Sequence, residues 1–158
     1  MGRSVLILGL IAAMGSSIVS SLLLAKGRSG RATCVGGTIA AVSSRAEGLI
    51  DTTDPAQFVF QAKAVRIQVP YAKVNLLEYG QTVSRRYALG VLLSPVLLLS
   101  KSRKHFLTVD YTDPEARQQA LVFQIHKDDV RATLVSLEVK TGLKVHYQDE
   151  EARKAGKG

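Results

Sequence analysis

Two runs of alternating apolar and polar side chains, separated by a short polar turn, predict an antiparallel hairpin in the second half of the chain. The first run covers residues 105–111 and the second covers 119–125. Asp113 and Pro114 stand between them and favour a turn, because Asp bonds nearby backbone groups and Pro fixes φ. The apolar side chains expected on one face of each strand are Leu107, Val109, Tyr111, Leu121, Phe123 and Ile125.

Directly after the hairpin the apolar spacing becomes helical, which predicts a helix over 127–141. Asp128 and Asp129 lie in its first turn and Lys140 in its last, as the helix dipole prefers. Gly142 suits the left-handed position that ends a helix. We expect the apolar stripe of this helix to pack on the hairpin. The stripe consists of Val130, Leu134, Leu137 and Thr141.

Shorter alternating runs earlier in the chain predict further strands. Pro55 and Pro70 end two of these runs. Together with the hairpin and the helix, they indicate a mainly β (α+β) fold. We expect an antiparallel sandwich or strongly bent barrel of about seven strands, with the C-terminal helix covering one opening. The earlier runs lie at 37–42, 48–51, 57–61, 65–69 and 71–79.

The first 25 residues form an apolar leader without a charge between Ser4 and Ala25. As a hydrophobic helix of roughly 21 residues it would span about 30 Å, enough to anchor the chain in a bilayer. Arg3 and the small residues of the run equally fit a secretory signal. Export and N-terminal anchoring in the cell envelope both stay open, as do leader cleavage and the orientation of the domain. Residues 26–36 are predicted to be a flexible linker.

The net charge of +8 is unevenly distributed. The basic excess lies in residues 1–104, which favours contact with an anionic surface such as a membrane or a nucleic acid. Cys34 is the single cysteine, so an intramolecular disulfide is excluded. Residues 148–158 are charged and have no apolar period, so we expect a disordered tail after a domain that covers 37–147.

An almost wholly apolar run, residues 88–99, lies between two basic clusters. It is too short to span a bilayer as one helix, and Pro95 would break it. In one interpretation the run is an internal strand or helix pair that completes the core. In the other it dips into an anionic membrane, where each flanking basic residue adds about 1 kcal/mol. The candidate contact residues are Arg85, Arg86, Tyr87, Lys101, Arg103 and Lys104.

Catalytic, phosphate-binding and paired-cysteine motifs do not occur in the sequence, so we predict no enzyme, no bound metal and no cofactor. His105, His126 and His146 lie near segment ends and lack the spacing of a helical metal site. The basic clusters contain aromatic residues, but the chain has no tryptophan, and the apolar run between them is unlike an RNA-stacking platform. Nucleic acid therefore ranks below a membrane as a partner.

The order of the predicted elements resembles the pleckstrin-homology-like (PH-like) superfold, particularly its GRAM and bacterial PH-like versions. Residues 65–74 read Val-Arg-Ile-Gln-Val-Pro-Tyr-Ala-Lys-Val and resemble the strand and corner "I-x-I-P-hydrophobic-x-x-I" of that group. The resemblance covers about residues 36–142 and implies some seven antiparallel strands, a C-terminal helix and a role in binding lipid, peptide or protein. The chain is also similar to small bacterial proteins that carry an N-terminal leader.

One departure from the PH-like pattern concerns the first pair of strands. PH domains that bind phosphoinositides concentrate Lys and Arg there, whereas this chain offers only Arg45. The expected function is a non-enzymatic PH-like binding module, exported or tethered by residues 4–25, that contacts a lipid surface or another envelope protein. The alternative is a structural or accessory subunit that docks a partner protein through residues 88–99.

Overall fold

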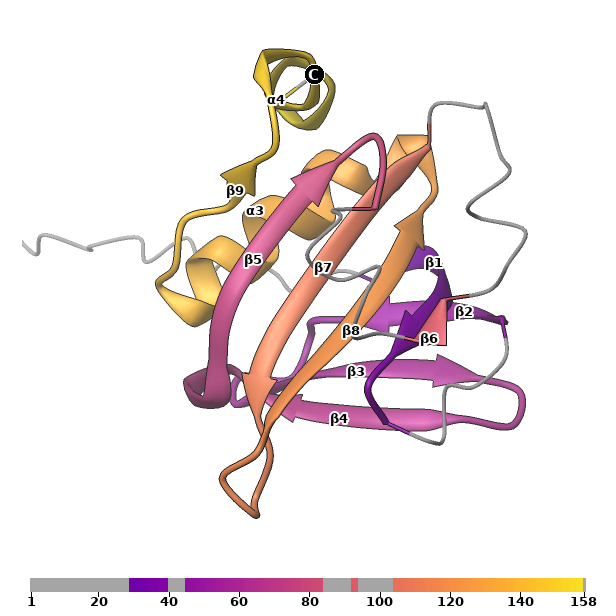
Figure 1. The fold of residues 1–158 in the computed structure, drawn as a ribbon, viewed down its shortest axis with the longest axis vertical. Coiled ribbons are helices and arrows are strands. Elements are labelled where there is room, and N and C mark those ends of the chain that lie inside the picture. The colour runs from indigo at the N-terminus through magenta and orange to yellow at the C-terminus, as the bar shows by residue number, and fades with distance from the viewer. Residues whose placement is uncertain (1–28, 40–44, 84–91, 94–103, 158) are drawn as a thin grey trace, which may run out of the picture.

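The computed structural model describes residues 29–39, 45–83, 92–93 and 104–157. These residues form a mainly β protein with two α-helices after the last long strand (Figure 1). The apolar leader at 4–25 lies outside the described residues. Within the described ranges, no helix is long and apolar enough to cross a membrane.

Nine strands in the described residues belong to one sheet. Eight of them follow the order β4-β3-β2-β1-β8-β7-β5-β9, and β6 pairs with β1. All neighbours are antiparallel except β5 and β9. The strands are β1 (Ser29–Gly37), β2 (Ala46–Asp51), β3 (Gln57–Ala62), β4 (Arg66–Pro70), β5 (Val74–Gly80), β6 (Leu92–Leu93), β7 (His105–Thr112), β8 (Gln118–Ile125) and β9 (His146–Tyr147).

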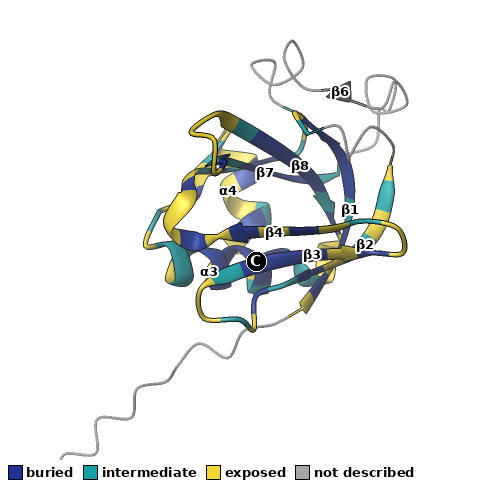
Figure 2. Ribbon diagram, turned by 90° about the horizontal axis from the view of Figure 1, so that it is seen from below, coloured by how far each residue is buried: buried dark blue, intermediate teal, exposed yellow. Residues whose placement is uncertain are grey.

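The mainly β fold is confirmed, but the sheet is open, so the barrel that was one form of the expected sandwich or barrel is not closed. Strands β4 and β5 follow each other in the chain but stand near opposite ends of the strand order. Pro70 ends β4, and a 3₁₀ turn at Tyr71–Lys73 redirects the chain before β5 begins. Pro70 still pairs with Gln57, and the N–H of Tyr71 donates to the carbonyl of Ala56, so contact with the β3 side ends only at the turn itself. The strands nevertheless curve strongly (Figure 2).

The predicted hairpin and the C-terminal helix are confirmed. Strands β7 and β8 pair antiparallel from His105↔Ile125 to Thr112↔Gln118. Helix α3 (Val130–Thr141) follows a 3₁₀ turn, and Gly142 ends it at φ 73° with its N–H donating to the carbonyl of Glu138. The six side chains expected on one face of the hairpin are all buried, in one cluster with Val130, Leu134 and Leu137 of the helix.

The turn between β7 and β8 depends on the carboxylate that the sequence indicated. Asp113 accepts hydrogen bonds from the backbone N–H and the guanidinium of Arg117 and from the side chain of Gln119, each at 2.8 Å. Burial raises the pKa of Asp113, but these hydrogen bonds and the charge of Arg117 outweigh it and hold the pKa at about 2. Asp113 is therefore ionised at neutral pH and closes the hairpin.

The first strand is longer and begins earlier than predicted, and this corrects the linker at 26–36. Strand β1 starts at Ser29 and pairs with both β2 and β8. Its Ser, Gly and Thr residues are typical of linkers, but Ala32 and Cys34 point into the core. Small residues are needed here because α3 lies close: a Cβ on Gly30 would come within 2.4 Å of Oγ1 of Thr133.

The C-terminal residues are ordered, which corrects the disordered tail predicted at 148–158. Helix α4 (Glu150–Lys157) follows β9 and begins where Asp149 accepts a hydrogen bond from the N–H of Ala152. Its buried face consists of Ala152 and Gly156. Such small side chains carry almost no hydropathy signal, so a search for apolar periods overlooks them. They allow the helix to approach the ring of Tyr147.

Helix α3 supplies the first test of this packing. Leu137 is 1% exposed on its inner side, whereas Val139 is 59% exposed on its outer side. We expect Leu137→Ala to lower the free energy of unfolding by about 2–5 kcal/mol, because it leaves a cavity in the main core. Val139→Ala should change it by less than about 0.5 kcal/mol. Urea denaturation of both variants measures the difference, and equal effects would contradict the packing of α3.

Candidate functional site

The segment that carries the predicted contact residues connects two neighbouring strands. Gly80, the last residue of β5, pairs with Phe106 near the start of β7. The chain therefore leaves the sheet after Gly80 and returns to it at His105, and the two strands that it leaves and enters lie side by side. Because the two basic clusters adjoin these two points in sequence, both are attached to the same end of the β5–β7 pair.

Most of the predicted contact residues lie outside the described residues. Lys104 is the exception: it directly precedes β7 and is half-buried. Within the apolar run 88–99, only Leu92 and Leu93 are described, as strand β6. They pair with Gly37 and Gly36 at the end of β1. The residues outside the described ranges are Arg85, Arg86, Tyr87, Lys101 and Arg103.

A tyrosine–histidine pair holds the ends of β5 and β7 together next to this connection. The hydroxyl of Tyr79 lies 2.5 Å from Nδ1 of His105, and the two rings are stacked. Burial raises the pKa of Tyr79 to about 12 and lowers the pKa of His105. At neutral pH both groups are therefore uncharged, and the phenol donates to the imidazole. Tyr79 is fully buried and His105 is partly buried, and their hydrogen bond connects β5 to the start of β7.

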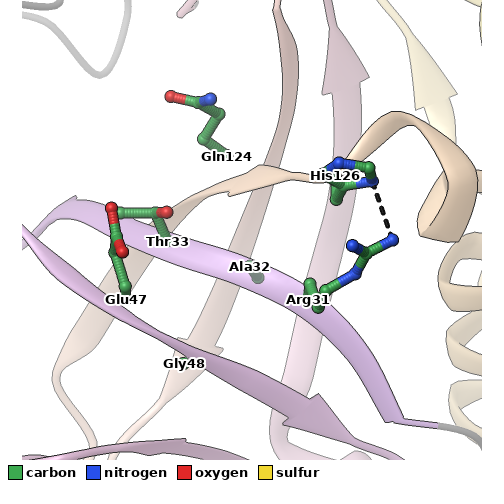
Figure 3. A pocket seen from close by; sticks show the side chains of 7 residues that line it. All are labelled: Arg31, Ala32, Thr33, Glu47, Gly48, Gln124 and His126. Atoms are coloured by element: carbon green, nitrogen blue, oxygen red, sulfur yellow. Dashed lines mark hydrogen bonds between the residues drawn. The ribbon is translucent and has the colours of Figure 1, made fainter.

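A shallow polar groove of about 350 Å³ lies between β1, β2 and the end of β8 (Figure 3). Of its lining residues, Arg31, Thr33 and Gln124 alternate along β1 and β8 with residues of the main core, so their side chains belong to the opposite face. Ala32 also borders the groove, although its side chain belongs to the main core. We call the side that packs on α3 the inner face and the opposite side the outer face. The groove is lined by Arg31, Ala32, Thr33, Glu47, Gly48, Gln124 and His126.

The cation in this groove is already engaged by groups of the protein. The backbone N–H and Nε of Arg31 both donate to Oδ2 of Asp129 at 3.0 Å. Nη2 of Arg31 donates to Nδ1 of His126 at 3.0 Å, as Figure 3 shows, and lies 3.6 Å from Asp128. These contacts connect β1 to the start of α3. The groove is thus a structural junction between strand and helix, with no surplus positive charge for an anionic ligand.

The remaining groups with possible chemistry lie apart. Among the described residues, no three His, Cys, Asp or Glu side chains are grouped so that they could hold a metal ion. His105 bonds to Tyr79, and His126 bonds to Arg31 on the outer face. Burial raises the pKa of the Cys34 thiol to about 12, so the nucleophilic thiolate is not populated at neutral pH.

Sequence analysis missed two features of this part of the molecule. Arg31 fell within the predicted linker, so its contact with Asp129 carried no signal. The second feature is an apolar cluster on the outer face, formed by Val35, Phe106, Ala120 and Val122. A signal for it exists, because 120–123 is an unbroken apolar run, and such a run indicates a strand buried on both faces.

The junction between β1 and α3 can be tested at two adjacent carboxylates. Asp129→Ala leaves the backbone N–H of Arg31 without its acceptor, and we expect a loss of about 1–3 kcal/mol in the free energy of unfolding. Asp128→Ala is the matched control, because Asp128 is 60% exposed, and it should cost less than about 0.5 kcal/mol.

The free energies of unfolding of these two variants should depend differently on pH. Burial raises the pKa of Asp129, but the hydrogen bonds from Arg31 outweigh it and hold the pKa below its ordinary value. The stabilisation is therefore present above the ordinary value and is lost as the pH falls through the lowered pKa. Between neutral and acidic pH, the free energy of unfolding should fall less steeply for Asp129→Ala than for Asp128→Ala. Denaturation curves recorded at several pH values measure this difference. Identical profiles would remove this role of Asp129.

Comparison with known proteins gives no family assignment. No family model matches the chain, and a search of curated proteins found no match. The PH-like resemblance therefore rests on the element order and on residues 65–74, and it stays a prediction.

Proposed function

We propose that this protein is a non-enzymatic binding module of PH-like type in the cell envelope, and that it contacts an anionic lipid surface. The contact is made by the basic flanks, which are the residues 85–86 and 101–104 on either side of the apolar run. The observation that carries the proposal is the pairing of Gly80 with Phe106. This pairing attaches both flanks to neighbouring strands at one end of the sheet.

Charge supports this assignment. No acidic residue occurs between Glu78 and Asp110, so the five basic residues of the flanks have no opposing charge nearby in sequence. Charges within about 10 Å act together at moderate ionic strength. Each basic residue near an anionic membrane adds about 1 kcal/mol, and several are needed for stable peripheral binding. The apolar leader supports the same location, because either anchoring or export brings the domain to the envelope.

The alternative function, docking of a partner protein through residues 88–99, has less support. Leu92 and Leu93 are already paired with β1, and this pairing holds the middle of the run against its own sheet. The polar groove offers no better site, because its arginine is bound by Asp129. The basic flanks therefore remain the best candidate for contact with a partner of opposite charge.

Vesicle flotation tests the proposal with two matched charge reversals. Arg85→Glu with Arg86→Glu changes one flank, whereas Lys73→Glu with Lys144→Glu changes two exposed lysines away from the flanks. The protein should start at residue 27, so that the whole of β1 is retained. We expect the unaltered protein to float with anionic vesicles and to stay unbound with neutral ones. The flank variant should lose about thirtyfold in affinity, which is two contributions of about 1 kcal/mol.

The control variant should keep most of its binding, because its lysines lie outside the flanks. Melting curves of both variants must match that of the unaltered protein, so that a loss of binding is not a loss of folding. Equal binding to neutral and anionic vesicles, or equal losses in the two variants, would contradict the proposal.

A further inference from the structure

The outer face of the sheet carries a buried apolar cluster that the inner core does not explain. Val35, Phe106, Ala120 and Val122, which we call the outer cluster, are between 0% and 6% exposed. Their neighbours along the strands point to the inner face: Cys34, Leu107 and Leu121 belong to the main core. The central strands β1, β8 and β7 are therefore buried on both faces.

The two helices do not cover the outer cluster. The helix side chains Leu134, Leu137 and Ala152 all belong to the main core on the inner face. Among the described residues, the outer cluster is joined by Val83, which is partly buried against it. A strand face that is buried to this degree needs an apolar layer above it. That layer must come from residues outside the described ranges.

One segment is attached at three points around the outer cluster. It begins directly after Val83, which packs on the cluster itself. Its middle, Leu92 and Leu93, pairs with the end of β1 directly after Val35. It returns at Lys104, two residues before Phe106. The cluster is thus bordered by both ends and by the centre of the segment 84–103.

The length of the segment suits this path. A line from β5 to the far side of β1 crosses β7 and β8, and neighbouring strands are about 4.8 Å apart, so the distance is roughly 15–20 Å. Leu92 follows Val83 by nine positions and precedes Lys104 by twelve. An extended chain reaches about 30 Å in nine residues. Both arms are therefore long enough to cross the outer face.

We propose that residues 88–99 pack on the outer face of β1, β8 and β7 and form the second core of the domain. The apolar character of the run matches the cluster, and its basic flanks adjoin the ends of β5 and β7 in sequence. The leader also is apolar, but it joins the fold at Ser29, at the opposite end of β1 from Val35. The loop 40–44 contains five residues and only small apolar side chains besides Val42. This inference goes beyond lipid binding, since it concerns the run and not its charged flanks.

Hydrogen–deuterium exchange of the full chain in detergent micelles tests this packing with one substitution at two places. Val122→Ser introduces a hydroxyl into the outer cluster, and Val139→Ser makes the same change at the exposed side of α3. We expect Val122→Ser to raise the exchange rate of residues 88–99 by about tenfold or more relative to the β3–β4 hairpin. Val139→Ser should leave the exchange of this run unchanged.

The possible outcomes distinguish between the segments that could cover the outer cluster. A run that is protected only by detergent would not respond to Val122→Ser, and that result would overturn the proposal. An increase confined to residues 1–28 or 40–44 would assign the cover to the leader or to the loop, and would overturn it as well. Arg85→Glu with Arg86→Glu should leave the protection of the run intact while it weakens vesicle binding about thirtyfold, so the two proposals fail independently.

A second measurement applies if Val122→Ser raises exchange throughout the domain. Residues 88–99 are replaced by a Gly/Ser segment of equal length, and the effect of Val122→Ser on the melting temperature is measured in both backgrounds. Because the outer cluster has then lost its cover, Val122→Ser should have much less effect in the replaced background. Leu137→Ala, on the inner face, should keep its full effect. An equal effect of Val122→Ser on the melting temperature in both backgrounds would contradict the packing of 88–99 on this face.

Discussion

Strand β1 is the hydrogen-bonded connection between the two halves of the sheet. On one side it pairs with β2, which leads to β3 and β4, and on the other side it pairs with β8, which leads to β7 and β5. Without β1 the described strands would form two separate sheets, each with an exposed edge. Its small residues let α3 lie directly on it, and Arg31 then connects it to Asp129 at the start of that helix. The order of the whole domain therefore depends on a segment that is rich in glycine.

Burial on both faces follows from this central position. The inner face of β1, β8 and β7 packs on α3, and the outer face carries its own apolar cluster. A domain of this arrangement has two cores that share one sheet, and only the first is closed by a helix. We propose that the apolar run 88–99, in the connection between β5 and β7, covers the outer face, and that its basic flanks contact a lipid surface. On these two proposals the apolar part of the segment completes the fold, and the basic part is available to a partner.

Local sequence patterns predicted those parts of the fold in which one face of a strand or helix is apolar and the other is polar. The β7–β8 hairpin, its Asp113 turn and the stripe of α3 were predicted because large apolar residues alternate with polar ones. Strand β1 and helix α4 were not, because apart from Val35 their buried residues are Ala, Gly and Cys, whose small side chains give no period. The junction of Arg31 with Asp129 was beyond prediction, since 98 positions separate the two residues and only the fold brings them together. The basic flanks were visible in sequence, but their common attachment required the pairing of β5 with β7.

The central role of β1 is tested most directly by residue-resolved hydrogen exchange of its backbone amides in the full chain. The account predicts that the hydrogen-bonded amides of 32–36 exchange as slowly as those of β8, because both strands open only when the whole sheet unfolds. Amides that exchange at the rate of an unstructured linker, while β8 stays protected, would show that the two halves of the sheet are not joined through β1 and would contradict the account.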